Sequence, residues 1–291
     1  MVSTAIFIVT ISSFFLALVN VMFNIYLIYT NSGKKNAQKK MDLTLIYYRF
    51  VVDFFQSSNL SIYLYYMLHT YETDQNYIKN FPFYVAWPNF QLGTIRCWLV
   101  FSIGLDRVLA TCTPIFYHNN RSKFPLSGVF LFIVAYALLE NYILFVHCDF
   151  EIDIPLDCNT FRCAIETCYH NYWKWYQQIM YVLIGTLSII LFFRLFIWNN
   201  CKKGAKNKAI SRATWISLLD SFIIFAFDFF PVFLTAQWPD INTKTVGPLG
   251  SLCKQLGLVI ESFVVCNVLL NKKVVPITRS QTSPTNFPVV Y

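Results

Sequence analysis

Seven apolar segments, each about as long as a membrane-spanning helix, follow one another through most of this chain. A helix that crosses the hydrocarbon core of a bilayer needs about 20 mostly apolar residues. Charged residues make up 13% of the chain, against about 25% in a soluble domain, so the composition excludes a soluble fold. We therefore predict an all-α membrane protein, a seven-transmembrane helix bundle with spans at about Thr4–Tyr29, Leu43–His69, Phe83–Thr113, Pro125–His147, Tyr176–Asn199, Trp215–Ala236 and Pro248–Leu270.

One domain and one tail are predicted. Residues 1–271 would form the transmembrane domain, and residues 272–291, rich in Ser, Thr and Pro, a short disordered cytosolic tail. The first 33 residues carry no charge and form an apolar run too long for a secretory signal, so they are predicted to be a retained span. No internal repeat is visible, which disfavours the inverted-repeat transporter folds.

Basic residues are distributed unequally between the predicted loops. They gather after spans 1, 3 and 5 and in the tail, and the loop after span 5 contains five basic residues and no acid: Lys202, Lys203, Lys206, Lys208 and Arg212. Because cytosolic loops are enriched in Lys and Arg, this pattern predicts an N-terminus outside and a C-terminus in the cytosol. Orientation in a bilayer then explains the net charge of +8, and no nucleic-acid partner is expected.

Four of the nine cysteines fall in the predicted extracellular loop between spans 4 and 5, namely Cys148, Cys158, Cys163 and Cys168. An oxidising compartment and an even local number favour two disulfides, for which three pairings are open. The alternative is a zinc site built from the Cys-x4-Cys-x4-Cys run and His170, although the spacing is wider than in a compact zinc knuckle.

Charged side chains inside the predicted spans are costly in a bilayer, so each is a candidate functional group. At a rise of about 1.5 Å per residue, four of them lie about 15–20 Å from the cytosolic ends of their spans. We predict a midplane polar cluster of Asp53, Arg96, Asp228 and Glu261, in which Arg96 is the shared counter-ion of Asp53 and Glu261. The alternative is that Arg96 extends alone toward the membrane surface and the acids are protonated.

A second layer of charge is expected about 8–10 Å from the cytosol, at Arg49, Arg194 and Asp220. If spans 3 and 6 approach each other, Asp220 reaches Arg107 and forms a latch whose opening exposes a cytosolic cleft. Pairing of Asp220 with Arg49 or Arg194 is the open alternative. Pro231 interrupts span 6 and is expected to kink it, providing a pivot for its cytosolic half.

The third span ends in the segment L-D-R-V-L-A-T-C-T-P-I-F-Y, residues 105–117. An Asp-Arg pair alone is typical of a charged stop at the membrane surface. Pro114 and Tyr117, however, follow Asp106 by eight and eleven positions, and the pair lies on the side that the lysines mark as cytosolic. We therefore predict a switch formed by Asp106, Arg107, Pro114, Tyr117, Asp220 and Pro231.

This arrangement resembles the G-protein-coupled receptors. In their rhodopsin-like class the pair begins Asp-Arg-Tyr, with Pro and Tyr at the same offsets, an Asp in span 2 where this chain has Asp53, and a Pro in span 6 where it has Pro231. Three departures are clear: Val108 replaces the Tyr, no Cys lies at the outer end of span 3, and span 7 ends C-N-V-L-L-N-K-K without Asn-Pro-x-x-Tyr.

With those departures, the phrases H-C-D-F (147–150), L-F-I-W-N-N (195–200) and F-D-F-F-P (227–231) are similar to the nematode chemoreceptors, in particular the serpentine receptor class BC, over nearly the whole chain. The resemblance implies a plasma-membrane receptor of sensory cilia that binds a small-molecule odorant or pheromone and activates a heterotrimeric G protein. The ligand is expected among the outer halves of spans 3, 5, 6 and 7. Depth alone selects as pocket candidates Tyr84, Trp87, Asn89, Phe233 and Gln237.

No phosphate-binding loop, zinc-protease motif or nucleophile elbow is present, so neither an enzyme nor a cofactor is expected. Lys254 lies nearer the outer end of span 7 than its middle, where a retinal Schiff base would form. The rival function is a transporter or ion channel that uses the midplane charges as an ion path. A third is an insect-type odorant channel, which has seven spans and the opposite topology.

Overall fold

The computed structural model describes residues 4–32, 41–73, 78–120, 126–154, 165, 167–201, 212–231, 234 and 248–270. Within these ranges the chain is helical apart from short turns. The helices, in chain order, are α1 (Thr4–Ser32), α2 (Met41–Thr73), α3 (Phe81–Cys112), α4 (Pro114–Asn120), α5 (Leu126–Tyr142), η3 (Ile143–His147), α6 (Thr167–Cys201), α7 (Arg212–Ile223), η4 (Ile224–Phe229) and α9 (Leu249–Leu270).

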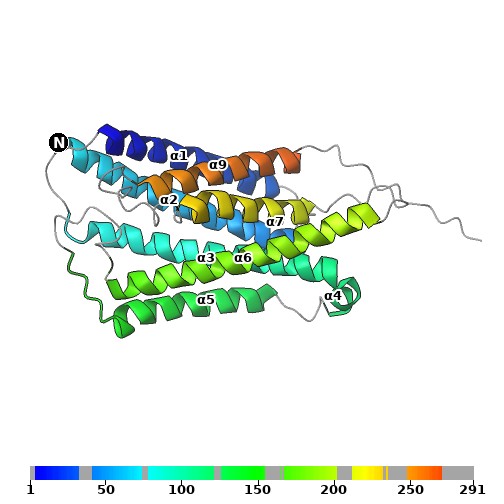
Figure 1. Cartoon of the computed structure of the whole chain (residues 1–291). Coiled ribbons are helices and arrows are strands. Elements are labelled where there is room, and N and C mark those ends of the chain that lie inside the picture. Colours follow the sequence, from blue (N-terminus) through cyan, green and yellow to red (C-terminus); the bar gives the residue numbers. More distant parts are fainter. Residues whose placement is uncertain are drawn as a thin grey trace, which may run out of the picture.

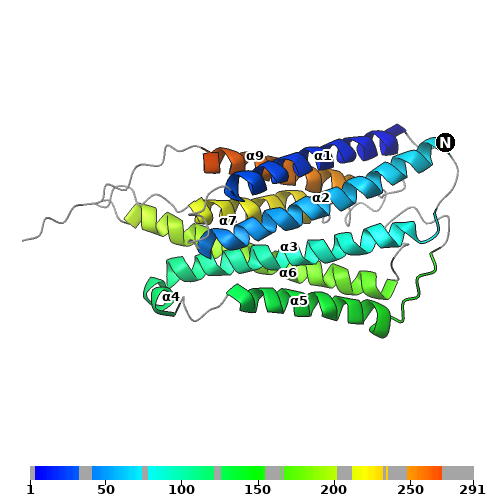
Figure 2. The ribbon, with the colours of Figure 1, turned by 180° about the vertical axis from the view of Figure 1, so that it is seen from behind.

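The long helices lie side by side along a common direction and form a bundle (Figure 1). Its two ends are named here by a feature of each: the disulfide end, where α1, α3 and α6 begin, and the α4 end, where they finish. α3 is the central helix, because it packs against α2 on one side and against α5, α6 and α7 on the others. Figure 2 shows the same order from behind, with α1 and α2 running along one face and α5 along the opposite one.

The seven predicted spans correspond to α1, α2, α3, α5 with η3, α6, α7 with η4, and α9. Among the described residues, four helical segments are long and apolar enough to cross a membrane, by length and composition alone: Thr4–Thr30, Leu126–His147, Thr167–Arg194 and Leu249–Asn267. α2 and α3 are outside this set, and both carry buried charged and polar side chains that face the interior. α7 is short, since its helix changes type at Ile224.

Large apolar side chains cover the outside of the bundle. Met22 and Leu131, for example, are more than two-thirds exposed, at 71% and 72%. Polar side chains in the interior bond across helices: the Asn20 amide on α1 donates to Ser57 Oγ on α2 (2.6 Å), and Ser262 Oγ on α9 donates to Asn20 Oδ1 (3.1 Å). An apolar exterior around hydrogen-bonded polar groups is the arrangement that a bilayer favours, because lipid offers no hydrogen bonds.

The middle of the sixth predicted span is π-helical. η4 occupies Ile224–Phe229, and the N–H of Phe230 bonds to the carbonyl of Phe225 five residues earlier. The predicted interruption at Pro231 therefore follows a π-helical turn, a feature that recurs at functional sites. α9 approaches η4 closely at Gly257, where an added Cβ would lie only 2.7 Å from the Cβ of Phe227.

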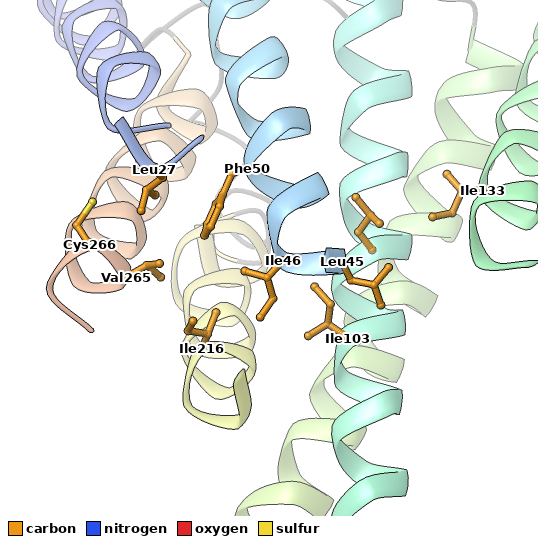
Figure 3. Close-up of a cluster of buried hydrophobic side chains, with 10 residues drawn as sticks. Leu27, Leu45, Ile46, Phe50, Ile103, Ile133, Ile216, Val265 and Cys266 are labelled. Carbon is orange, nitrogen blue, oxygen red and sulfur yellow. The ribbon is translucent and has the colours of Figure 1, made fainter. Parts of the chain in front are cut away.

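A cluster of buried apolar side chains fills the bundle toward the α4 end (Figure 3). It draws on six helices, with members that include Leu27, Ile46, Phe50, Ile103, Ile133, Ile216 and Val265. Phe50 directly follows Arg49, and Ile103 lies two turns after Arg96 on α3. The cluster therefore adjoins the buried arginines and closes the interior toward the α4 end.

Candidate functional site

Arg96 on α3 is 2% exposed and holds two acids from different helices. Its Nε donates to Asp53 Oδ1 on α2 at 2.8 Å, and its Nη2 donates to Glu261 Oε2 on α9 at 3.1 Å. Asp228 on η4 lies farther away, with Oδ2 at 3.8 Å from Arg96 Nη1. The planar guanidinium has five N–H donors, so one arginine is able to serve several carboxylates at once.

Arg49 on α2 is a second buried arginine in the same network, 1% exposed. It forms ion pairs with Asp220 of α7 and Glu261 of α9, and its Nε lies 3.4 Å from Asp53 Oδ2 one helical turn away. Glu261 therefore contacts both arginines. The two arginines and four acids, called here the charge network, join α2, α3, α7, η4 and α9.

The structure thus brings together the four residues of the predicted midplane cluster. The two expected layers are joined into one charge network, because Arg49 pairs with Glu261 and Asp53 as well as with Asp220. Arg49 and Asp53 stand four residues apart on one helix face, so the arginine side chain spans the difference in depth of about 6 Å. Arg194, the third residue of the expected second layer, instead points its Nε toward the Thr111 carbonyl at 3.5 Å.

Asp220 forms an ion pair with Arg49, the alternative to the predicted pairing with Arg107. Asp220 is fully buried and pairs with Arg49, whereas Arg107 pairs with its own neighbour Asp106. Taking a charged pair out of water is costly, and removing one partner of such a buried pair typically costs about 3–5 kcal/mol. The contacts of Asp220 and Arg49 therefore tie α7 firmly to α2.

A separate polar group lies at the α4 end. α3 ends at Cys112 and α4 begins at Pro114, whose ring suits the first position of a helix. The change of direction carries Tyr117 back to α3, where its hydroxyl donates to Asp106 Oδ1 at 2.6 Å. Asp106 Oδ2 accepts from Arg107 Nη2, so one carboxylate holds both residues.

Tyr117 is a neutral donor in this group. Burial and the hydrogen bond to Asp106 raise the pKa of Tyr117 above its usual value. Arg107 is 5% exposed. Asp106, Arg107 and Tyr117, called here the α4-end triad, are therefore held together by a carboxylate that accepts from both partners.

The five pocket candidates have different positions. Trp87 faces the interior, where its Nε1 donates to Asn141 Oδ1 of α5 at 3.1 Å, and Asn89 is partly buried with its Oδ1 enclosed. Tyr84 is wrong as an interior residue, because its position on α3 leaves it 61% exposed on the outer surface. Phe233 and Gln237 lie outside the described residues.

Sequence reasoning missed Glu140 on α5, which is fully buried. Its Oε1 accepts a hydrogen bond from Thr94 Oγ1 of α3 at 2.9 Å. Glu140 is the one acidic residue in the segment 125–147. That isolation within an apolar run was the signal that could have identified it.

Cys148 and Cys168 form a disulfide across 20 residues of sequence. Cys158 and Cys163, the other two members of the predicted set, lie outside the described residues. With Cys168 in a disulfide, the alternative zinc site loses one of its thiolates. Beside the disulfide, the side chain of Asn80 also holds the chain after η3, donating to the Ile152 carbonyl (3.1 Å) and accepting from the Ile154 N–H (2.9 Å).

Comparison with known proteins gives one family. A family model described as "Serpentine type 7TM GPCR chemoreceptor Srbc" matches residues 1–273, nearly the whole chain. None of the curated proteins matches the chain. The match covers every helix described above.

Proposed function

The chain belongs to the Srbc family of serpentine seven-transmembrane chemoreceptors, and from this premise we propose that it binds an extracellular small molecule and activates a heterotrimeric G protein. The proposal places the N-terminus and the disulfide end outside the cell and the α4 end in the cytosol, as the lysine-rich loops indicate. The plasma membrane of a sensory cilium is the proposed location. The observation that carries the proposal is the α4-end triad, which keeps Arg107 paired at the face that a G protein would meet.

Signalling by a receptor requires an element with two arrangements, one of which the ligand favours. The charge network has the composition for this role. Two arginines face four acids, and Glu261 contacts both arginines, so a small shift of α9 relative to α3 would exchange one ion pair for another. Packed ionic interfaces respond to such shifts in discrete steps.

The position of the network connects the two ends of the bundle. Its members lie on α2, α3, α7, η4 and α9, and η4 precedes Pro231, where the helix lacks a backbone donor. We propose that ligand binding in the half toward the disulfide end re-pairs the network and turns α7. The movement of α7 would then release the α4-end triad and expose Arg107.

An ion path through the network receives less support. The apolar cluster of Figure 3 adjoins Arg49 and Arg96 on the α4 side and fills the interior there. Ion permeation needs polar or hydrated groups on both sides of a charged site. The receptor function is therefore the better account of these buried charges.

Expression of the full chain in cultured cells tests the proposal. An N-terminal epitope tag should be stained in intact cells, and a panel of volatile and water-soluble compounds should include at least one that raises intracellular calcium through a co-expressed G protein. Blocking nucleotide exchange on the G protein should abolish that response. A ligand-evoked current that persists under the block, or a tag stained only after permeabilisation, would contradict the proposal.

A further inference from the structure

Glu140 stands apart from the charge network. Its Oε1 accepts from Thr94, while Oε2 is buried and has no hydrogen-bond partner among the described residues. In the part of the chain that the structure describes, no arginine, lysine or histidine forms an ion pair with it. Leaving a buried carboxylate oxygen without a donor is costly, so this side chain calls for a partner that the described residues do not supply.

Four tyrosines of α5 and α6 form a connected group on the same part of the bundle as Glu140. The hydroxyls of Tyr136 on α5 and Tyr172 on α6 are 2.8 Å apart and bond to each other. Tyr169 and Tyr176 on α6 are 0% and 7% exposed, and the hydroxyl of each is buried without a hydrogen-bond partner in the described part of the chain. Tyr136 lies one helical turn before Glu140 on α5, and Trp87, which contacts Tyr169, bonds to Asn141 next to Glu140. Three enclosed polar atoms, on Glu140, Tyr169 and Tyr176, therefore have unused hydrogen-bonding capacity.

The rings of these tyrosines make a continuous aromatic wall. Tyr169 packs edge-on against Trp87 with ring centroids 5.1 Å apart, and Tyr136 lies 5.3 Å from Tyr176. The ring of Tyr172 lies between these two pairs, with its centroid 5.7 Å from that of Tyr169 and 6.4 Å from that of Tyr176. The negative faces of aromatic rings attract cations, most strongly where water is excluded.

We propose that Glu140 and this aromatic wall form a binding site for a small protonated amine. The ammonium group would donate to Glu140 Oε2 and to the unpaired tyrosine hydroxyls, while its charge lies against the rings. The proposal rests on the receptor function and names the ligand class. The sequence placed the ligand among spans 3, 5, 6 and 7. The proposed site instead lies between α3, α5 and α6, which correspond to spans 3, 4 and 5.

The position of the site suits a ligand that enters from the disulfide end. Glu140 precedes Cys148 by eight residues, a rise of about 12 Å along the helix. Between them lies the π-helical η3, Ile143–His147. π-Helical turns often mark functional positions, and this one sits directly between the site and the loop that the disulfide holds.

Binding to the purified full-length protein tests the site without a G protein. The probes are straight-chain primary amines from propylamine to hexylamine, each compared with the alcohol of the same length, and the readout is the ligand-dependent shift in Tm. At least one amine should bind at least tenfold more tightly than its alcohol. The Glu140→Gln variant should bind that amine at least tenfold more weakly, and the exposed matched control Glu151→Gln should bind it as the wild type does.

A second variant, Tyr169→Phe, tests the site independently if Glu140→Gln does not fold. It keeps the ring and removes a buried hydroxyl that bonds to none of the described residues, and it should weaken amine binding at least threefold. The site is overturned if no amine raises the Tm of the wild type, or if amines bind the folded variants as tightly as the wild type. Amine binding that depends on Glu140 but evokes no signalling would instead count against the proposed function alone.

Discussion

Tyr117 donates a hydrogen bond to Asp106 across the break between α3 and α4, with 2.6 Å between the two oxygens. Eleven residues separate the two in sequence, and Pro114 starts the short helix that brings them together. The same carboxylate pairs with Arg107. Tyr117 therefore fixes where Asp106 lies, and with it the position of the carboxylate that holds Arg107.

Removing the Tyr117 hydroxyl should loosen Arg107. We expect Tyr117→Phe to raise basal G-protein activation about two- to fivefold, because a hydrogen bond to a charged group contributes about 1.5–3 kcal/mol and only part of it bears on the switch. The measurement is ligand-free calcium or nucleotide-exchange signal at equal surface expression. Tyr142→Phe, at an exposed position on α5, should leave the basal signal unchanged. Basal activity at the wild-type level in Tyr117→Phe would show that the hydroxyl does not restrain the switch.

The ion pair of Arg96 with Asp53 should be visible in a charge swap. Either Arg96→Glu or Asp53→Arg leaves like charges buried together. Breaking a buried pair typically costs about 3–5 kcal/mol, and each variant should lower the free energy of unfolding by at least that amount. The double variant restores opposite charges and should recover surface expression and Tm relative to both single variants. If the double variant is no more stable than the weaker single variant, the pairing is not what stabilises this region.

Close packing of α9 on η4 should make Gly257 sensitive to a single methyl group. An added Cβ would lie 2.7 Å and 2.9 Å from two atoms of Phe227 and 3.0 Å from Ile223. We expect Gly257→Ala to cost about 1–3 kcal/mol, measured as a lower Tm of the purified protein. Gly250→Ala on the same helix is the matched control, since nothing lies within 4 Å of its added Cβ. Equal Tm values for the two variants would contradict the close approach.

Loss of the Cys148–Cys168 disulfide should destabilise the disulfide end. The bond closes a loop of 20 residues, and Cys148→Ser is expected to lower stability by about 2–4 kcal/mol. Cys112→Ser, at a free cysteine on α3, should have little effect. Tm values measured with and without reductant check this: the reductant should lower the Tm of the wild type and leave that of Cys148→Ser unchanged. A wild-type Tm insensitive to reductant would argue against the bond.

The depth of a residue along its helix could be predicted from the sequence, but the face of the helix on which it lies could not. A constant rise per residue places Arg96 level with Asp53 and Glu261, and the structure has both contacts. The same rule says nothing about which face a residue occupies. It therefore left the partner of Asp220 open between three arginines and put the exposed Tyr84 among the pocket residues.

Contacts that depend on a local break or on a missing partner were also beyond the sequence. The hydrogen bond from Tyr117 to Asp106 requires α3 to stop at Cys112 and α4 to turn back, and only the offset of eleven residues hinted at it. Glu140 could have been found, because a lone acid in an apolar span is costly whatever its neighbours are. The tyrosines of the proposed site come mainly from α6, which the sequence could not place beside it.

Nucleotide exchange on a reconstituted G protein tests the central claim most directly. Purified receptor and heterotrimer are combined in lipid nanodiscs with an agonist found in the cell-based screen, and binding of a non-hydrolysable GTP analogue is timed. Wild type and Lys79→Ala, an exposed change at the disulfide end, should accelerate exchange at least tenfold on agonist addition. Arg107→Ala should retain agonist binding and lose that acceleration. Acceleration by the Arg107→Ala variant equal to that of the wild type, or none by the agonist-bound wild type, would contradict the account.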